Sequence, residues 1–195
     1  MNAESEDRIV GLWATPFLHF VVDGHDRHTA SLKSLAERSP DTDLLRNADA
    51  AAVWLMARIE EAVSAYLDRW TEGEPAARRF TTRLVVHGHG DYEPLRNHPD
   101  AVLNGIFYVT VPDGRRDGHH RFDADSNAIS FYDPRFAMNM GAIAKDPYSN
   151  LEKQVRPTAG TMIVWPSYVD YFVHPNLADG TQVSVHFEVA AGADG

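Results

Sequence analysis

Cysteine is absent from this sequence of 195 residues. Without thiols there are no disulfides, thiolate metal sites or cysteine nucleophiles, so a bound metal must be held by His, Asp, Glu or Tyr. No apolar run approaches the roughly 18 residues of a membrane span. The acidic start from Met1 to Asp7 lacks the basic-then-apolar order of a signal peptide. We therefore expect a soluble, cytoplasmic protein that has no membrane partner.

Clusters of basic residues are also scarce. The chain has 18 Lys and Arg against 28 Asp and Glu, a net charge of −10, and its adjacent basic pairs are Arg78-Arg79 and Arg115-Arg116. Nucleic-acid binding requires clustered basic groups that neutralise phosphates, so we expect no nucleic-acid partner. The sequence also lacks a Gly-x-Ser-x-Gly elbow, a phosphate loop and a dinucleotide fingerprint, which leaves hydrolase, kinase and Rossmann functions unsupported.

The length fits one domain, residues 1–195, with a helical part at about 25–72 and a β core at about 80–190. Between Ala52 and Trp70, apolar residues recur every three or four positions, and charged residues take the opposite face. This spacing predicts an amphipathic helix that packs its apolar stripe against a sheet.

From Phe80 onward the apolar residues alternate with a period of two. The predicted strands are 80–86, 106–111, 129–132, 161–165, 168–173 and 182–189, with an entering strand within 9–18. Gly, Pro, Asn and Asp separate them. Helices followed by many short strands indicate an α+β, mainly β chain, an antiparallel double-sheet roll backed by helices. We expect residues 136–156 to form a loop or lid over the mouth of this roll.

A candidate metal-binding motif precedes the second of these strands. His98-Pro99-Asp100 carries an imidazole and a carboxylate two positions apart, and residues at that spacing on an extended strand point the same way. Two histidines and one carboxylate on one face of Fe(II) leave positions open for a keto acid and dioxygen. Asn-His-Pro-Asp is also good turn chemistry, so a surface loop is the alternative.

Four segments occur in an order that resembles a known family. They are Gly90-Asp91-Tyr92 through Asn97-His98-Pro99, Asn104-Gly105-Ile106-Phe107-Tyr108-Val109, Phe131-Tyr132-Asp133-Pro134-Arg135, and Gly160 through Trp165-Pro166-Ser167-Tyr168. The set resembles the 2-oxoglutarate and Fe(II)-dependent oxygenases of the small bacterial and phage type, related in fold to prolyl hydroxylases. The resemblance implies a double-stranded β-helix (jelly roll) with N-terminal helices packed outside. It also implies a dioxygenase that hydroxylates or oxidises a small molecule with Fe(II), dioxygen and 2-oxoglutarate. Whether the chain forms a homodimer stays open.

At the metal site the sequence departs from the family pattern at two places. Arg96 stands where relatives often carry a second histidine, and Tyr171 stands where the downstream histidine is expected. The implied ligands are His98, Asp100 and a third residue, for which we expect His174. The alternatives are a Tyr171 phenolate and an incomplete site. In the resemblance, Arg96 and Tyr171 are then the candidate catalytic residues.

The co-substrate position departs as well, because Gln182 replaces the arginine that pairs with the far carboxylate of 2-oxoglutarate in relatives. Glutamine brings a hydrogen bond but no charge, so a dicarboxylate would be neutralised by Arg83, Arg96 or Arg135. Tyr108, by its place in the hairpin, could donate to the same carboxylate. The candidate co-substrate residues are therefore Tyr108, Gln182 and Arg135.

Two rival interpretations remain. His87-Gly88-His89 with Glu93 has the His-x-His-x-x-x-Glu spacing of cupins, which would make a metal enzyme that does not use 2-oxoglutarate. The other rival is a degenerate jelly roll that binds a small molecule without catalysis, for which the aromatic cluster from Trp165 to Phe172 would suit a ligand pocket.

Overall fold

The protein is described here by a computed structural model that covers residues 14–70, 78–113, 126–135 and 151–192. Within these residues the elements follow in the order β1 (Leu18–Val21), α1 (Asp26–Arg38), the 3₁₀ helix η1 (Leu44–Arg46), α2 (Ala50–Trp70), β2 (Arg78–His87), β3 (Glu93–Arg96), β4 (Leu103–Thr110), β5 (Ile129–Tyr132), β6 (Glu152–Val155), β7 (Thr161–Pro166), β8 (Tyr171–Val173) and β9 (Gln182–Ala191).

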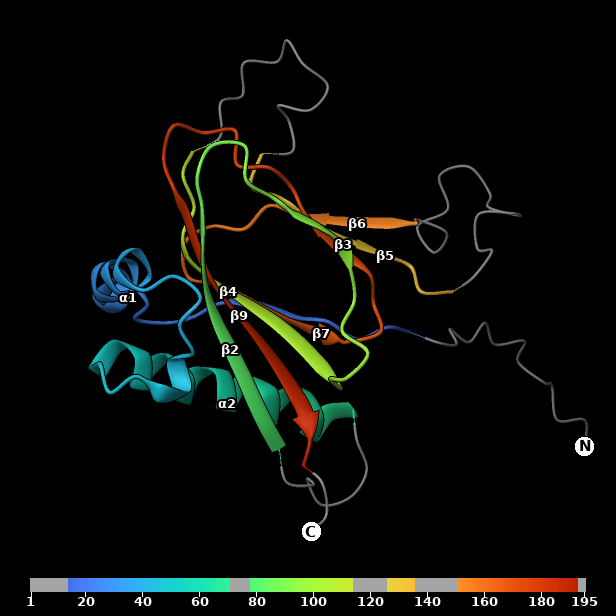
Figure 1. The fold of residues 1–195 in the computed structure, drawn as a ribbon. Helices are drawn as coiled ribbons and strands as arrows, with labels where there is room; N and C mark the ends of the chain where they lie inside the picture. Colours follow the sequence, from blue (N-terminus) through green and yellow to red (C-terminus); the bar gives the residue numbers. More distant parts are fainter. Residues whose placement is uncertain (1–13, 71–77, 114–125, 136–150, 193–195) are drawn as a thin grey trace, which may run out of the picture.

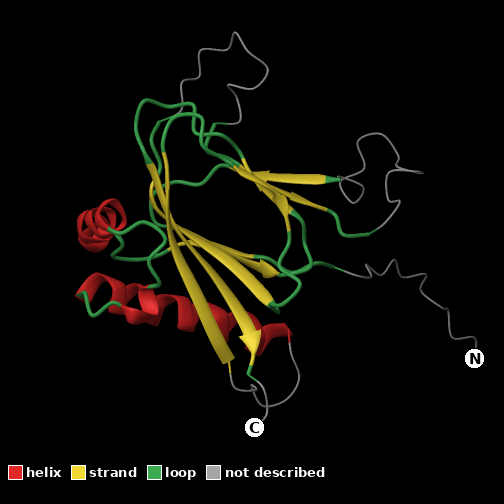
Figure 2. Cartoon of the chain, in the orientation of Figure 1, coloured by secondary structure: helices red, strands yellow, loops and turns green. Residues whose placement is uncertain are grey.

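The strands form two antiparallel sheets that make a roll. The larger sheet has the order β1-β7-β4-β9-β2, and the smaller has the order β3-β8-β5-β6. Both helices lie on the outer face of the larger sheet, while the smaller sheet lies on its other side (Figures 1 and 2). The predicted double-stranded β-helix with N-terminal helices packed outside is therefore confirmed. Among the described helices, none combines the length and the apolar character that crossing a bilayer requires.

Alternation along the strands divides the apolar side chains between two cores. On β4, Phe107 and Val109 pack toward the helices, in the core that contains Leu55 and Ile59 of α2. Ile106 and Tyr108 belong instead to a second core inside the roll. Residues two apart on a strand share a face, so β4 and β7, at the middle of the larger sheet, serve both cores. The helix-facing core fixes this sheet and leaves its other face free to line the interior of the roll.

The same alternation carries polar side chains into the roll. β2 and β9 pair over their whole length, which sets Arg83 opposite His186 and Thr81 opposite Glu188. On the next strand, Asn104 pairs with Glu188. These neighbours share the interior face because directly paired residues of an antiparallel ladder point the same way. The interior of the roll is therefore polar along this wall.

Two strands of the smaller sheet were not predicted. β3 has the sequence Glu-Pro-Leu-Arg and lies at the edge of its sheet, which is where a strand tolerates a proline. β6 is Glu-Lys-Gln-Val and lies at the other edge, where polar side chains face solvent. Neither segment shows apolar alternation. The predicted strand at 168–173 is shorter, at 171–173. Most of the predicted entering strand and residues 136–150 of the predicted lid lie outside the described residues.

Candidate functional site

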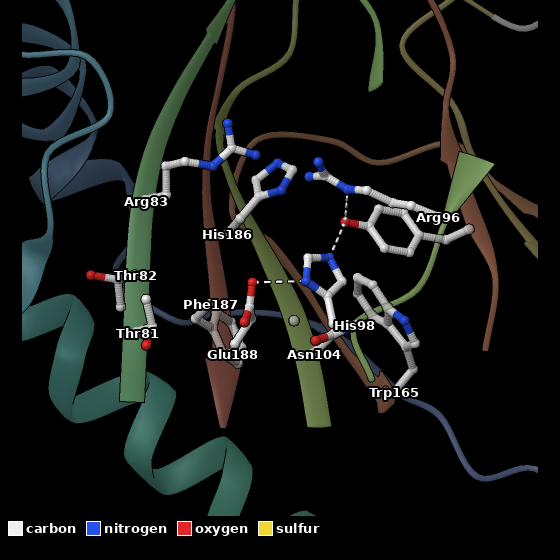
Figure 3. Close-up of a pocket in the computed structure, with 12 residues that line it drawn as sticks. Thr81, Thr82, Arg83, Arg96, His98, Asn104, Trp165, His186, Phe187 and Glu188 are labelled. Carbon is white, nitrogen blue, oxygen red and sulfur yellow. Dashed lines mark hydrogen bonds and ion pairs between the residues drawn. The ribbon is translucent and has the colours of Figure 1, made fainter. Parts of the chain in front are cut away.

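A pocket of about 190 Å³ opens between the two sheets. Its lining comes from β2, β4, β7, β8 and β9, from Arg96 of β3, and from His98 in the connection that follows it. The residues are Thr81, Thr82, Arg83, Arg96, His98, Asn104, Gly105, Trp165, Tyr171, His186, Phe187 and Glu188 (Figure 3). The volume lies below the roughly 300–1,000 Å³ of pockets that hold drug-sized ligands. The pocket therefore suits a small molecule.

His98 is held in this pocket by its backbone and by both ring nitrogens. Its N–H donates to the carbonyl oxygen of Ser167 at 3.2 Å, which ties the connection before β4 to the end of β7. Nδ1 lies 2.8 Å from Oε1 of Glu188, and Nε2 lies 2.9 Å from the hydroxyl oxygen of Tyr171. The imidazole thus bridges a carboxylate on β9 and a phenol on β8 (Figure 3).

These contacts define the protonation of the bridge. Burial lowers the pKa of His98, and Glu188 opposes the shift only in part, so the ring is neutral at pH 7. A carboxylate accepts hydrogen bonds, which places the ring proton on Nδ1 and leaves Nε2 as an acceptor. The Tyr171 hydroxyl then donates to Nε2 and accepts from Nε of Arg96, at 2.9 Å. Burial also raises the pKa of Tyr171 despite the guanidinium beside it, so the phenol keeps its proton.

Behind Arg96 lies a buried carboxylate shared by two guanidinium groups. Oε1 of Glu93 accepts from Arg83 at 2.7 Å, and Oε2 pairs with Arg96. Burial by itself would raise the pKa of Glu93, but His186, Arg96 and Arg83 outweigh it and hold the pKa below its ordinary value. Glu93 is 5% exposed, and a buried carboxylate of this kind needs its cationic partners. One continuous polar network therefore crosses the pocket. Its members, in order of contact, are Arg83, Glu93, Arg96, Tyr171, His98 and Glu188.

The structure does not bring the three predicted metal ligands together. His98 lines the pocket, but Asp100 is exposed and does not line it. His174 follows β8, three residues after Tyr171, and its Nε2 lies 2.7 Å from the Ser130 hydroxyl rather than in the pocket. Within the described residues, which include all three, no group of three or more His, Asp or Glu side chains is arranged to hold a metal ion. The residues that do meet are His98 and the two expected catalytic residues, Arg96 and Tyr171.

The predicted co-substrate residues lie apart from the pocket lining. Gln182 is buried at the start of β9, where its Oε1 lies 3.2 Å from Nδ1 of His87. Arg135 is exposed and pairs with Asp133, two residues earlier. Tyr108 is buried inside the roll, and its hydroxyl has no hydrogen-bond partner among the described residues. Of the three arginines considered for a dicarboxylate, the pocket contains Arg83 and Arg96.

The cupin-like set is not assembled either. His87 contacts Gln182, whereas His89 points its Nδ1 at the carbonyl oxygen of Ala178, 3.3 Å away. The carboxylate of Glu93 forms ion pairs with Arg83 and Arg96. His87 ends β2, His89 lies in the turn that follows, and Glu93 begins β3, so the three residues have no shared ligand position.

The sequence prediction missed Glu188, the partner of His98. A signal for it existed, because Ser184, His186 and Glu188 alternate on the last strand, where a polar row on one face suggests an interior wall or an outer one. The ladder with β2 and β4 places His186 and Glu188 in the pocket. Burial lowers the pKa of His186 to about 3, so this ring is neutral at pH 7.

Comparisons with known proteins agree with this architecture. A family profile described as "Putative 2OG-Fe(II) oxygenase" matches residues 83–188, more than half of the chain. The chain therefore belongs to this family. The predicted class is confirmed: the family is one of oxidoreductase enzymes that depend on Fe(II) and 2-oxoglutarate and act with dioxygen on small molecules. A search of curated proteins found no match.

Solved structures of similar fold include a prolyl-4-hydroxylase from Pseudomonas putida, which has 14% identity and a TM-score of 0.63 and covers 91% of this chain and 86% of its own. HygX from Streptomyces hygroscopicus, solved with nickel and 2-oxoglutarate, has 10% identity and a TM-score of 0.60 over 92% of this chain and 83% of its own. The viral collagen prolyl hydroxylase vCPH from Paramecium Bursaria Chlorella virus-1 has 10% identity and a TM-score of 0.57, covering 90% and 96%. At these identities the likeness concerns the fold.

The iron of the family can be tested against the residues in the pocket. A facial site needs two imidazoles and a carboxylate on one side of the metal. Here Nε2 of His98, the ring nitrogen that Glu188 leaves for a metal, faces the protonated hydroxyl of Tyr171, and the guanidinium of Arg96 lies next to that hydroxyl. The fixed positive charge of Arg96 would repel a metal cation placed beside it in a partly buried site. The residues that this structure gathers do not fit a facial iron site.

Proposed function

We propose that this member of the oxygenase family binds its small-molecule substrate in the pocket around His98, and that this pocket is the place of its reaction. One observation carries the proposal. Ten of the twelve residues that line the pocket, including all of its charged side chains, lie within the stretch 83–188 that matches the family, and Thr81 and Thr82 directly precede it. The part of the sequence that defines the family is thus the part that builds the pocket.

Within this proposal each polar residue has a stated task. His98 gives the pocket an imidazole of fixed tautomer, because Glu188 accepts from Nδ1 and Nε2 accepts from the Tyr171 hydroxyl. Tyr171 fixes the ring from the other side, and the two rings stack at 13° from parallel. Trp165 walls the pocket and packs edge-on against Tyr171, with ring centroids 5.1 Å apart. Together they hold a substrate in one orientation against the sheet and exclude water from it.

The test compares the two residues of the His-x-Asp motif. The protein is supplied with Fe(II), ascorbate, dioxygen and 2-oxoglutarate, and succinate formation is measured for wild type, His98→Ala and Asp100→Ala. If the pocket is the reaction site, His98→Ala loses most of the succinate formation and Asp100→Ala retains it. Loss of succinate formation in both variants would indicate that Asp100 belongs to the reaction site, as the sequence predicted.

A second candidate function is favoured by a specific observation. Arg96 and Tyr171 form a hydrogen-bonded pair beside His98, at the two positions where the resemblance implies histidines. A binding protein of the same fold, without turnover, would be compatible with this pair. It predicts no succinate formation by the wild type and less than one equivalent of iron after anaerobic reconstitution.

A further inference from the structure

Three side chains of the pocket meet at one oxygen atom. Nε2 of His98 and Nε of Arg96 each lie 2.9 Å from the hydroxyl oxygen of Tyr171. The sheet brings them together, because Arg96 pairs directly with Tyr171 across the β3 and β8 ladder and His98 lies two residues after Arg96. Directly paired residues and residues two apart share one face of a sheet, so three metal ligands could stand at these positions.

The side chains that meet there are poor ligands as they stand. A guanidinium is a donor only, so Arg96 offers a metal no lone pair. The Tyr171 hydroxyl accepts from Arg96 and donates to Nε2 of His98, and Nδ1 of the same ring is held by Glu188. Burial raises the pKa of Tyr171, which opposes the loss of the phenolic proton that ligation would require. A metal ion at this point would have to displace these contacts.

Arg96 is a permanent cation at this point. Burial works to lower the pKa of its guanidinium, but the hydrogen bond to Tyr171 and the negative charge of Glu93 outweigh burial, and the pKa is raised. The side chain therefore keeps its charge at every pH at which the protein is folded. Figure 3 shows its guanidinium directed toward His98 and His186 inside the pocket.

The charges of the polar network already balance. It contains two guanidinium groups, those of Arg83 and Arg96, and two carboxylates, those of Glu93 and Glu188. Asp41 also approaches Arg83, at 3.6 Å, but its side chain is 73% exposed and largely screened by water. A divalent ion among these groups would add two positive charges that the network does not compensate, and a buried charge without a partner is costly.

We propose that the pair of Arg96 and Tyr171 takes the place of a metal ion in this chain. The guanidinium supplies the fixed positive charge of the pocket, the phenol holds His98, and the wild-type protein takes up no iron there. The inference concerns the pocket of the proposed function but does not depend on turnover in it. Because His98 keeps an imidazole at the meeting point, replacing the other two side chains by imidazoles should create a metal site.

The experiment is anaerobic titration of the full, untagged chain with Co(II), whose visible absorption reports nitrogen ligands, and metal analysis after loading with Fe(II). The wild type should take up less than about a tenth of an equivalent of either metal. The double variant Arg96→His with Tyr171→His should take up about one equivalent, and adding His98→Ala should abolish that uptake. Arg46→His, at an arginine whose side chain is 87% exposed and outside the pocket lining, is the matched control and should behave as the wild type.

A second variant guards against loss of the fold. Arg96→His removes a partner of buried Glu93 and can unfold the chain. Tyr171→His alone leaves both arginines of Glu93 in place and sets a second imidazole beside His98. It should bind Co(II) at least about tenfold more tightly than the wild type, but more weakly than the double variant, because the charge of Arg96 still repels the ion.

The outcomes separate this inference from the proposed function. No uptake by the wild type, with uptake by either histidine variant that His98→Ala abolishes, supports the inference whether or not succinate is formed in the turnover assay. About one equivalent of Fe(II) in the wild type, lost in His98→Ala, overturns it and leaves the proposed function standing. No uptake by any folded variant also overturns it, because Arg96 and Tyr171 would then not be what excludes the metal. Succinate formation that His98→Ala does not change would defeat the proposed function alone.

Discussion

The Nε2 atom of His98 lies 2.9 Å from the hydroxyl oxygen of Tyr171, on rings that stack at 13°. His98 lies two residues after β3, and Tyr171 begins β8, the neighbour of β3 in the smaller sheet. Because the other ring nitrogen of His98 contacts Glu188 on β9 of the larger sheet, the imidazole connects the two sheets across the pocket. The hydroxyl also accepts from Arg96, so one oxygen atom holds three side chains in place.

Tyr171→Phe removes this oxygen, and Tyr108→Phe is its matched comparison. Tyr171→Phe leaves Nε of Arg96 without its acceptor, and hydrogen bonds to charged groups contribute about 1.5–3 kcal/mol. The hydroxyl of Tyr108 is buried and has no partner among the described residues, so its removal should change the free energy of unfolding by no more than about 0.5 kcal/mol. Urea unfolding of both variants measures the difference. Equal losses would indicate that the Tyr108 hydroxyl bonds a buried water.

His174→Ala tests whether the residue expected as third ligand serves the fold. Ser130 is fully buried on β5, and its hydroxyl lies 2.7 Å from Nε2 of His174. Loss of the imidazole leaves that hydroxyl without this partner, at a cost of about 1–3 kcal/mol. Succinate formation in the turnover assay should be unchanged, because His174 does not line the pocket. Loss of bound iron in this variant, with normal stability, would instead support the ligand prediction.

Acid should destabilise the protein through His186. Burial lowers its pKa to about 3, whereas an unfolded chain has a histidine pKa of about 6.5. Between these values the unfolded state binds the extra proton, so stability is fully present above pH 6.5 and falls as the pH decreases. The slope for this group reaches about 1.4 kcal/mol per pH unit.

The measurement is the free energy of unfolding from pH 7 to 4.5, above the range in which most carboxylates take up protons. His186→Gln should flatten the curve there. Identical slopes for variant and wild type would assign the acid sensitivity to other groups. Below pH 4.5, Glu93 adds a loss of its own, because its depressed pKa contributes stability only while it is ionised.

Gly105→Ala should destabilise the chain by steric overlap. A Cβ at this position would lie 2.0 Å from Cζ of Phe187, which is paired with Gly105 across the β4 and β9 ladder. Overpacking of this kind costs typically about 1–3 kcal/mol. In the double variant Gly105→Ala with Phe187→Leu, part of the loss should be recovered, because the smaller side chain vacates the space. A double variant no more stable than the sum of the single ones would point to backbone strain at Gly105 instead.

The sequence predicted the larger sheet and α2 well, because both have a strong apolar period. Phe107 faces one core and Ile106 faces the other, as the alternation of apolar residues on this strand predicts. The helix predicted from Ala52 to Trp70 matches α2. The edge strands β3 and β6 carry no such period. The order of motifs in the sequence was enough to predict His98, Arg96 and Tyr171 as site residues. The contact between Glu188 and His98 could not be predicted, because ninety residues separate the two and only the register of β9 brings them together.

The two walls of the pocket differ in how firmly the backbone holds them. Arg83, His186 and Glu188 lie on β2 and β9, which pair without interruption over ten residues. Arg96 and Tyr171 lie on β3 and β8, which are four and three residues long and pair with a shift of register. Amide hydrogens of β3 and β8 should therefore exchange with solvent through local openings long before those of β9. Exchange slowed in β3 and β8 by 2-oxoglutarate would show that a ligand closes the site from that side.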